Sequence, residues 1–579
     1  MLDIMFHQGL LLLCVSVAVI GQDLTEKSAA YWEQVSEAEL LETLQYQKLN
    51  IKKAKNVIIF IGDGMGVTTV TAGRILKGQN SGASGEETKL AMDKLPYTGV
   101  SRTYSVNRQV SDSASTATAF LTGVKTNDYV LGLNGNSVKG ICAGSINESN
   151  LLTSVLLEAK MAGMSAGIVT TTTINHATPA AAYANSPDRL WYSDAEMTAE
   201  AKENGCKDIA QQFIDKSDQF TVVLGGGRQY FKPNTTFDVE YTDRANLRLD
   251  GQDLIEVWKA KQSDRNSAYV WNKEQFDQVD VAKTDSLLGL FEPSHMNYEA
   301  HRAQDGAGEP SLKDMTTKAI RMLKKNDQGF ILLVEGGKID HGHHAGKAYL
   351  ALHDLVALDD AIEAAVEMTS DDETMIIVTA DHSHVFTIGG YSHRGNPIFG
   401  AAPNVNNPKL VDDGKPFTTL LYGNGPGHST LNGAGSCERE NITLITTDDP
   451  GYKQQSAVPL PSETHGGEDV VIMARGPMAH LFEGVHEQSY IAHVIRYATC
   501  IGKKSKNCAA QLEQSTDLIF VSFLGFRLSS GQAQLALYIT FGLLMAACII
   551  AIAANLQLCR MARQSARKHE DPKVLNEKV

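Results

Sequence analysis

The chain has 579 residues, enough for one large domain or several ordinary ones. Hydrophobic residues make up 43% and charged residues 21%, a balance that allows a sizeable core and excludes a largely disordered chain. The formal net charge of −15 argues against a broad nucleic-acid-binding face, and it means that any phosphate chemistry needs a locally positive site.

The N-terminus carries an apolar run over residues 9–21, which predicts a secretory signal peptide ending near Gly21. The segment before it contains Asp3 and His7 but no Lys or Arg, so a buried N-terminal helix is the alternative. Export agrees with three glycosylation sequons, at Asn147, Asn234 and Asn441.

The next stretch, residues 29–49, has the charged amphipathic pattern of a helix, either a surface helix or an arm that packs on a partner subunit. Beyond it, strand-like apolar runs alternate with helical patterns. The expected strands are residues 57–62, 167–173, 220–224, 330–334 and 375–379, and the expected helices are residues 151–162, 312–324 and 347–368. This alternation predicts an α/β fold with a large, mostly parallel sheet flanked by helices, in a catalytic domain over residues 22–508.

The alternation breaks over residues 393–461, which are rich in Gly, Pro, Asn and Ser and predict an irregular insertion. Residues 509–534 read as a juxtamembrane linker. Residues 535–554 contain no charge and can span a bilayer, and the basic tail, residues 555–579, would then be cytoplasmic. A glycolipid-anchor signal is the alternative, because the small residues Ser529, Ser530 and Gly531 precede the apolar run.

Eight cysteines occur, of which Cys14 lies in the signal region and two lie in or beside the C-terminal apolar segment. The exported body keeps five, enough for two disulfides with one cysteine left over. We expect the pairs Cys500–Cys508 and Cys142–Cys206, which would leave Cys437 free, although sequence does not fix the connectivity.

Potential metal ligands follow several of the expected strands, and sites in open α/β sheets form at the carboxyl ends of strands. Asp63 stands between two glycines, where a strand-ending turn is the simpler reading. Asp340 and His344 are four residues apart, so they share one face of a helical turn in a geometry that suits Zn²⁺. The pair Asp381-His382 follows another strand, and the last candidate, His465, lies among glycines.

Ser113 precedes a helix-competent segment, where the helix dipole favours an alkoxide and a bound phosphate. An ordinary helix cap is the local alternative, because no nearby histidine suggests a general base. A metal ion would therefore have to activate the hydroxyl. Arg189, thirteen residues after His176, offers a planar fork for phosphate oxygens.

Taken together, these motifs resemble the alkaline phosphatase family, and closely its animal members. The matching motifs are, in the family order, Gly62-Asp63-Gly64, Asp112-Ser113-Ala114, His176-Ala177-Thr178-Pro179, Glu335 to His344, Thr379 to His384, and Thr464-His465-Gly466. The match runs from about residue 40 to residue 508. It implies a homodimeric phosphate-monoester hydrolase that works through a phosphoserine at Ser113.

The resemblance also implies two zinc ions and one magnesium ion. One zinc would be held by Asp340, His344 and His465, and the other by Asp63, Asp381 and His382, with Ser113 as a further ligand. Magnesium would be held by Asp63, Thr178 and Glu335, with His176 close by, and Arg189 would clamp the phosphate. A fourth, calcium-like site would use Glu240, Phe291, Glu292 and Glu309.

The insertion at residues 393–461 resembles the crown region of the animal enzymes, and the N-terminal helix resembles their dimer arm. Two departures stand out: Ser115, where many relatives have Gly or Ala, and the charged C-terminal tail, since animal relatives commonly end in a glycolipid-anchor signal. Two other functions stay open, a phosphodiesterase or sulfatase-like hydrolase of the wider superfamily, and a surface-binding protein on the same fold.

Overall fold

A computed structural model describes residues 28–45, 49–402, 413–428, 439–502, 521–523, 526–528 and 530–567. The expected signal peptide, Cys437 and Cys508 lie outside the described residues. The chain divides into two compact units, Met1–Gly502 and Lys503–Val579.

The first unit is built on a ten-stranded sheet in the order β15-β2-β14-β8-β1-β7-β3-β4-β6-β5. Its strands are β1 (Asn56–Gly62), β2 (Tyr97–Arg102), β3 (Ser165–Thr173), β4 (Val222–Gly226), β5 (Ser267–Val270), β6 (Ser286–Leu290), β7 (Phe330–Gly336), β8 (Thr374–Ala380), β14 (Val470–Arg475) and β15 (Gly484–Glu487). Strand β14 runs antiparallel to both of its neighbours, and the other pairs are parallel. The predicted large, mostly parallel sheet is confirmed.

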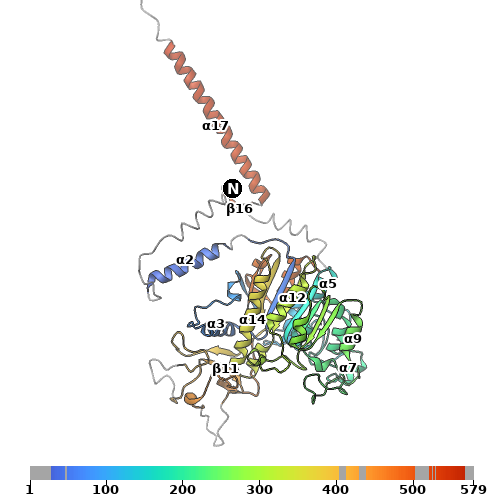
Figure 1. The fold of residues 1–579 in the computed structure, drawn as a ribbon. Helices are drawn as coiled ribbons and strands as arrows, with labels where there is room; N and C mark the ends of the chain where they lie inside the picture. The colour runs from blue at the N-terminus through green and yellow to red at the C-terminus, as the bar shows by residue number, and fades with distance from the viewer. Residues whose placement is uncertain are drawn as a thin grey trace, which may run out of the picture. The chain divides into compact units, whose positions relative to one another are not determined.

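Helices alternate with these strands through the first unit (Figure 1). They are α2 (Ala29–Gln45), α3 (Val67–Asn80), α4 (Ser113–Thr122), α5 (Val155–Met161), α6 (Ala177–Ala180), α7 (Ala199–Glu203), α8 (Ile209–Asp215), α9 (Leu254–Lys261), α10 (Lys273–Gln278), α11 (Glu299–Arg302), α12 (Leu312–Leu323), α13 (Lys338–His344), α14 (Ala348–Met368) and α15 (Tyr490–Thr499). All five strands and all four helices expected from the sequence are present with slightly shifted ends.

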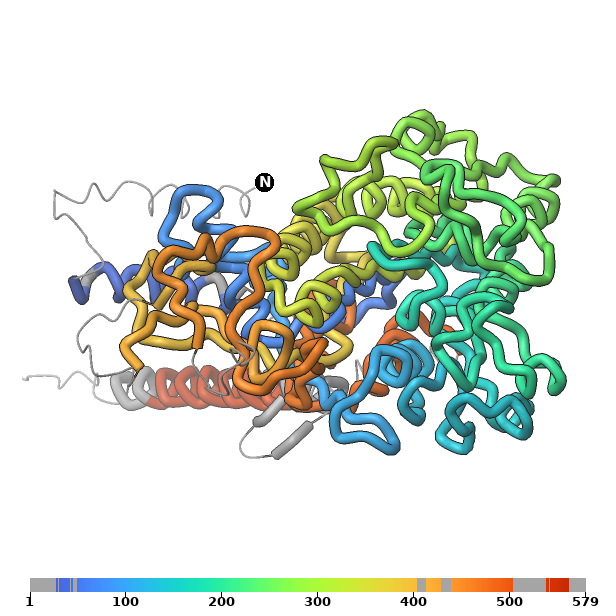
Figure 2. Tube along the Cα trace, turned by 90° about the horizontal axis from the view of Figure 1, so that it is seen from below, coloured from blue at the N-terminus to red at the C-terminus, as the bar shows by residue number. Residues whose placement is uncertain are grey.

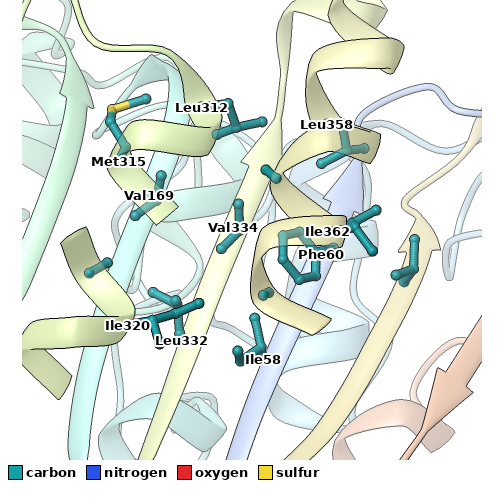
Figure 3. Close-up of a cluster of buried hydrophobic side chains, with 14 of the residues drawn as sticks. Ile58, Phe60, Val169, Leu312, Met315, Ile320, Leu332, Val334, Leu358 and Ile362 are labelled. Carbon is teal, nitrogen blue, oxygen red and sulfur yellow. The ribbon is translucent and has the colours of Figure 1, made fainter. Parts of the chain in front are cut away.

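The core lies between the central strands and the helices α12 and α14 (Figure 3). Ile58 and Phe60 of β1 pack with Leu358 and Ile362 of α14 in one buried cluster. Every residue of β1, β7 and β8 is buried, which is typical of parallel strands covered on both faces and explains why they appear in the sequence as unbroken apolar runs.

The segment at residues 393–461 is less irregular than its composition predicts. Within it, β11 (Leu420–Gly425) and β12 (Ser456–Pro459) form a three-stranded sheet with β10 (Phe386–Ile388). A further pair joins β9 (Ser383–His384) to β13 (His465–Gly466). Figure 2 shows this orange part of the chain at the opposite end of the first unit from the green region of α7 to α9.

One expected disulfide is present, since Cys142 and Cys206 are bonded. Cys500 is also disulfide-bonded. In the second unit, β16 (Val521–Phe523) pairs with β17 (Phe526–Leu528), and α17 (Ser530–Arg567) follows. Within α17, residues 538–561 are long and apolar enough to cross a membrane.

Candidate metal centre and active site

The ends of the central strands bring the predicted ligands to one edge of the sheet. Gly62 at the end of β1 is level with Gly336 of β7 and with Ala380 of β8. The residues that follow these strands therefore emerge together, as expected for the carboxyl edge of a parallel sheet. The site is assembled there.

The first group of candidate ligands contains Asp340, His344, His384 and His465, whose ligand atoms lie within 4.8 Å of one another. Asp340 and His344 project from α13, four residues apart, as the sequence predicts. The Nε2 atoms of His344 and His465 are 3.1 Å apart, and each lies close to Asp340 Oδ1, at 3.3 and 3.4 Å.

The tautomers of these two rings show why a cation fits between them. His344 Nδ1 lies 2.6 Å from the Glu463 carbonyl, and His465 Nδ1 lies 2.8 Å from the Ser111 carbonyl. A carbonyl only accepts, so each Nδ1 carries a proton. In the neutral tautomer this leaves an Nε2 lone pair on each ring, directed toward the other ring and toward Asp340. Converging lone pairs and a carboxylate suit a tetrahedral metal such as Zn²⁺.

The second group contains Asp63, Asp381 and His382, all fully buried. His382 Nε2 lies 3.1 Å from Asp381 Oδ2 and 3.6 Å from Asp63 Oδ1. Burial and the neighbouring carboxylates, above all Asp381, raise the pKa of Asp63 well above its usual value. Neither carboxylate oxygen of Asp63 has a hydrogen-bond partner among the described residues, and a cation would satisfy both.

The third group joins Asp63 and Glu335 with His176. Thr170 and Thr172 donate hydrogen bonds to Glu335 Oε2, while Glu335 Oε1 has no hydrogen-bond partner in the described part of the chain. Burial raises the pKa of Glu335 to about 7, although nearby hydroxyls, including that of Thr178, oppose this shift. Carboxylate and hydroxyl oxygens suit Mg²⁺.

Ser113 is the first residue of α4, and its Oγ lies 3.2 Å from His382 Nε2. Asp112 caps the helix by accepting from the backbone N–H groups of Ala114 and Ser115. Burial holds the pKa of His382 well below its usual value. The hydroxyl therefore faces a neutral ring whose Nε2 is also directed at two carboxylates, so Ser113 belongs to the same cation-binding arrangement.

Arg189 lines the same pocket as Ser113 and is held from two sides. Its Nη1 donates to Asp112 Oδ2 at 3.0 Å, and its Nη2 donates to His176 Nε2 at 3.0 Å. Burial and Arg189 keep the pKa of His176 well below its usual value, so this ring accepts as the neutral form. The guanidinium enters the site with its orientation fixed before any phosphate binds.

A pocket of about 480 Å³ joins these groups. Its lining includes Val110, Ser111, Asp112, Ser113, Asp128, Tyr129, Arg189, Leu190, Asp340, His344, Ser462, Glu463, Thr464 and His465. A phosphoryl group in this pocket can contact the serine, the arginine and the first group of metal ligands at once.

A separate acidic group includes Glu292, which follows β6. Glu240, Glu292 and Asp305 place carboxylate oxygens within 4.8 Å of one another. Burial and neighbouring carboxylates, first Glu309, raise the pKa of Glu292 to about 8. Glu309, expected in this group, is the carboxylate that most affects Glu292: its Oε1 accepts from the Asn297 N–H, its Oε2 has no hydrogen-bond partner among the described residues, and Asp305 is an additional carboxylate of the group.

Two residues of the site were not predicted, His384 and Asp305. His384 donates to Asp340 Oδ1 and Glu463 Oε2, and although burial opposes the charge, these carboxylates raise its pKa to about 10. It stands in a predicted motif, Thr379 to His384, and its spacing of two from His382 could have indicated it. Asp305 lies in a loop without such a pattern.

Known proteins are similar to this chain over most of its length. The model of the family described as "Alkaline phosphatase" matches residues 54–501. The tissue-nonspecific alkaline phosphatase of Rattus norvegicus is 53% identical over 488 residues, covering 84% of this chain and 91% of that protein. The alkaline phosphatase of Gadus morhua is 50% identical over 481 residues, covering 83% and 98%.

Solved structures agree on the fold. The alkaline phosphatase of Thermus thermophilus superposes with a TM-score of 0.55 at 24% identity, covering 82% of this chain and 98% of that one. The enzyme of the Antarctic bacterium TAB5 gives a TM-score of 0.53 at 22% identity, covering 78% and 100%.

Proposed function

The chain belongs to the alkaline phosphatase family and is a phosphate-monoester hydrolase, and we propose that it works through a phosphoserine intermediate at Ser113. The observation that carries this proposal is the position of the Ser113 hydroxyl. It lies at the N-terminus of α4, 3.2 Å from His382, in the pocket that also contains Arg189. This is where an attacking oxygen and a bound phosphoryl group would meet.

The three groups of ligands are proposed to hold three ions. Nitrogen-rich Asp340, His344 and His465 favour zinc, and so do Asp63, Asp381 and His382. The oxygen donors Asp63, Thr178 and Glu335 favour magnesium, with Asp63 shared between two ions. When bound, the ions would lower the pKa of the serine hydroxyl and of water and would stabilise the oxygen of the departing alcohol.

The chain's own residues perform the rest of the reaction. Ser113 Oγ forms a bond to phosphorus while the bond from phosphorus to the alcohol oxygen breaks, and the alcohol leaves with the serine's proton. Arg189 holds non-bridging oxygens as charge redistributes. Water then forms the second bond to phosphorus, the bond to Ser113 Oγ breaks, and inorganic phosphate is released while the serine regains a proton.

The direct test is covalent trapping. The protein is incubated with a phosphate monoester, quenched with acid and mapped for phosphopeptides, with the metal content of each variant measured in parallel. Phosphate on the peptide containing Ser113, and its loss together with turnover in Ser113→Ala at unchanged zinc content, are the expected results. Full turnover by Ser113→Ala would disprove the role.

The outer acidic group is proposed to bind calcium or a similar hard cation. Glu240, Glu292 and Asp305 supply side-chain oxygens, and the backbone oxygen of Phe291, next to Glu292, is the expected further ligand. The loss of a cation-dependent rise in Tm in Glu292→Gln would support this assignment.

Assembly and anchoring are further proposals. We infer a homodimer in which α2 packs on the partner subunit, because Trp32, Leu40 and Leu41 of this helix are exposed.

Anchoring would use the apolar stretch within α17, as a membrane span or as a glycolipid-anchor signal. Retention of activity on cells treated with a phosphatidylinositol-specific phospholipase supports the span, and release supports the glycolipid.

A further inference from the structure

One residue of the active-site pocket has a backbone conformation that its side chain disfavours. Among the described residues, three that are not glycine have positive φ: Tyr129 at 68°, Met478 at 61° and Cys500 at 58°. Bulky side chains rarely adopt this left-handed conformation, and such strain gathers at functional sites. Tyr129 lines the pocket that contains Ser113, whereas Met478 and Cys500 are not among its lining residues.

The backbone of Tyr129 is tied to two residues of the site. Its N–H donates to Asp112 Oδ1 at 3.0 Å, and its carbonyl accepts from the Arg189 N–H at 2.9 Å. Asp112 in turn caps α4 and binds the Arg189 guanidinium. These are main-chain contacts, so glycine would make them without strain. The contacts therefore explain the conformation but not the aromatic ring.

The ring itself lies next to the groups that would hold a phosphate. The Arg189 guanidinium carbon is 5.8 Å from the ring centroid, and Lys139 Nζ is 3.0 Å from it. Val110 and Leu190, which are 44% and 46% exposed, line the same pocket. The pocket thus combines polar groups that suit phosphate with an apolar wall of Val110, Tyr129 and Leu190.

The charges near this wall offset one another only in part, because two cations lie near one carboxylate. Arg108 lies 3.9 Å from Asp128, and Lys139 also lies near this carboxylate. This leaves a small positive excess, which does not distinguish one uncharged leaving group from another. A preference for one leaving group over another would therefore depend on its shape and on its apolar contacts with the wall.

We propose that the Tyr129 ring determines substrate specificity by contacting the leaving group, and that it favours phosphate monoesters of planar aromatic alcohols. The proposal rests on the proposed function, because the leaving group reaches the ring only when its phosphate lies at Arg189. Lys139 Nζ covers one face of the ring, so a planar group would pack on the other face or against the ring edge, in an offset or edge-on arrangement that a small alkyl group lacks.

Competitive inhibition tests the proposal without depending on the rate of the chemical step. The Ki of phenylphosphonate is compared with that of methylphosphonate for the full-length protein and for Tyr129→Phe, Tyr129→Asn and Tyr129→Gly. Phe keeps the ring, while Asn and Gly remove it and tolerate the positive φ, so all three variants should fold. Tm and zinc content check that they do.

The wild-type protein and Tyr129→Phe should bind phenylphosphonate more tightly than methylphosphonate. In Tyr129→Asn and Tyr129→Gly this ratio should fall by about 2- to 10-fold, the range of an aromatic pair, with the Ki of methylphosphonate nearly unchanged. An unchanged ratio would overturn the assignment. Equal weakening of both inhibitors would also overturn it, since the ring would then act through Arg189. Failure of the Ser113 trapping experiment, by contrast, would refute the proposed function itself.

Discussion

Replacement of Arg189 by alanine is the perturbation whose size follows most directly from the structure. The guanidinium is held by Asp112 and His176 at 3.0 Å each, so its remaining N–H groups can bind phosphate without further ordering of the side chain. A hydrogen bond to a charged group contributes about 1.5–3 kcal/mol, which corresponds to about 10- to 150-fold in affinity for each bond lost.

The assay is inhibition by inorganic phosphate. We expect the Ki of phosphate to rise by about 10- to 100-fold in Arg189→Ala, and kcat/KM for a phosphate monoester to fall at least as much. Arg189→Lys should recover part of the loss, because it restores the charge without the fork. Arg265, which pairs with Asp264 at 3.9 Å and is 39% exposed, provides the control position, and its replacement by alanine should leave both values unchanged.

Two results would refute this reasoning. An unchanged phosphate Ki in Arg189→Ala would show that the guanidinium does not bind the anion. A loss of zinc in the same variant would show that the effect passes through the metal ligands instead. Metal analysis of every variant is therefore part of the experiment.

Three further predictions follow from other parts of the structure. His465→Ala should lose about one zinc per chain and most of its turnover but keep its magnesium, because His465 belongs to the first ligand group only. Metal analysis measures both contents, and full zinc retention would contradict the ligand assignment. In calcium-free buffer, the Tm should fall between about pH 5 and pH 8, because the pKa of Glu292 is raised to about 8 and its protonated form therefore favours the folded state. This part of the fall in Tm should vanish in Glu292→Gln or when calcium is added. Removing the Cys142–Cys206 disulfide, which spans 64 residues, should lower the free energy of unfolding by about 4 kcal/mol in denaturant titration, and an unchanged midpoint would contradict the chain-entropy argument.

The central sheet could be predicted because its strands carry a local signal. Strands β1, β7 and β8 are buried on both faces and so consist of continuous apolar residues that end in glycine or alanine. The edge strands β2 and β15 have no such run, since residues of β2 alternate between buried and exposed and β15 is largely exposed. Their place in the sheet depends on pairing with each other and, for β2, with β14, which local sequence does not encode.

Local sequence also identifies some candidate metal ligands and not others. Asp340 and His344 share a helical turn, so their spacing alone indicates a site. His384 and Glu463 form a buried pair across 79 residues, and only the pairing of β9 with β13 brings their segments together. His465, which two glycines follow, is the first residue of β13. The same strand pairing therefore brings His465 to the site.

The arrangement of charges explains why Ser113, the proposed nucleophile, would need no histidine base. Asp63, Asp381, Glu335 and Asp340 are buried together in a chain whose net charge is −15. Burial and the repulsion among these carboxylates raise the pKa of Asp63, so a bound cation would be favoured at this edge. The same carboxylates would repel a phosphate dianion, and the positive charges of Arg189 and of His384, which is bound to Asp340, do not balance four carboxylates. We therefore expect phosphate affinity to depend on cations bound by these carboxylates. If Ser113 is the nucleophile proposed above, the cations that attract the phosphate would also activate its hydroxyl, which lies 3.2 Å from His382.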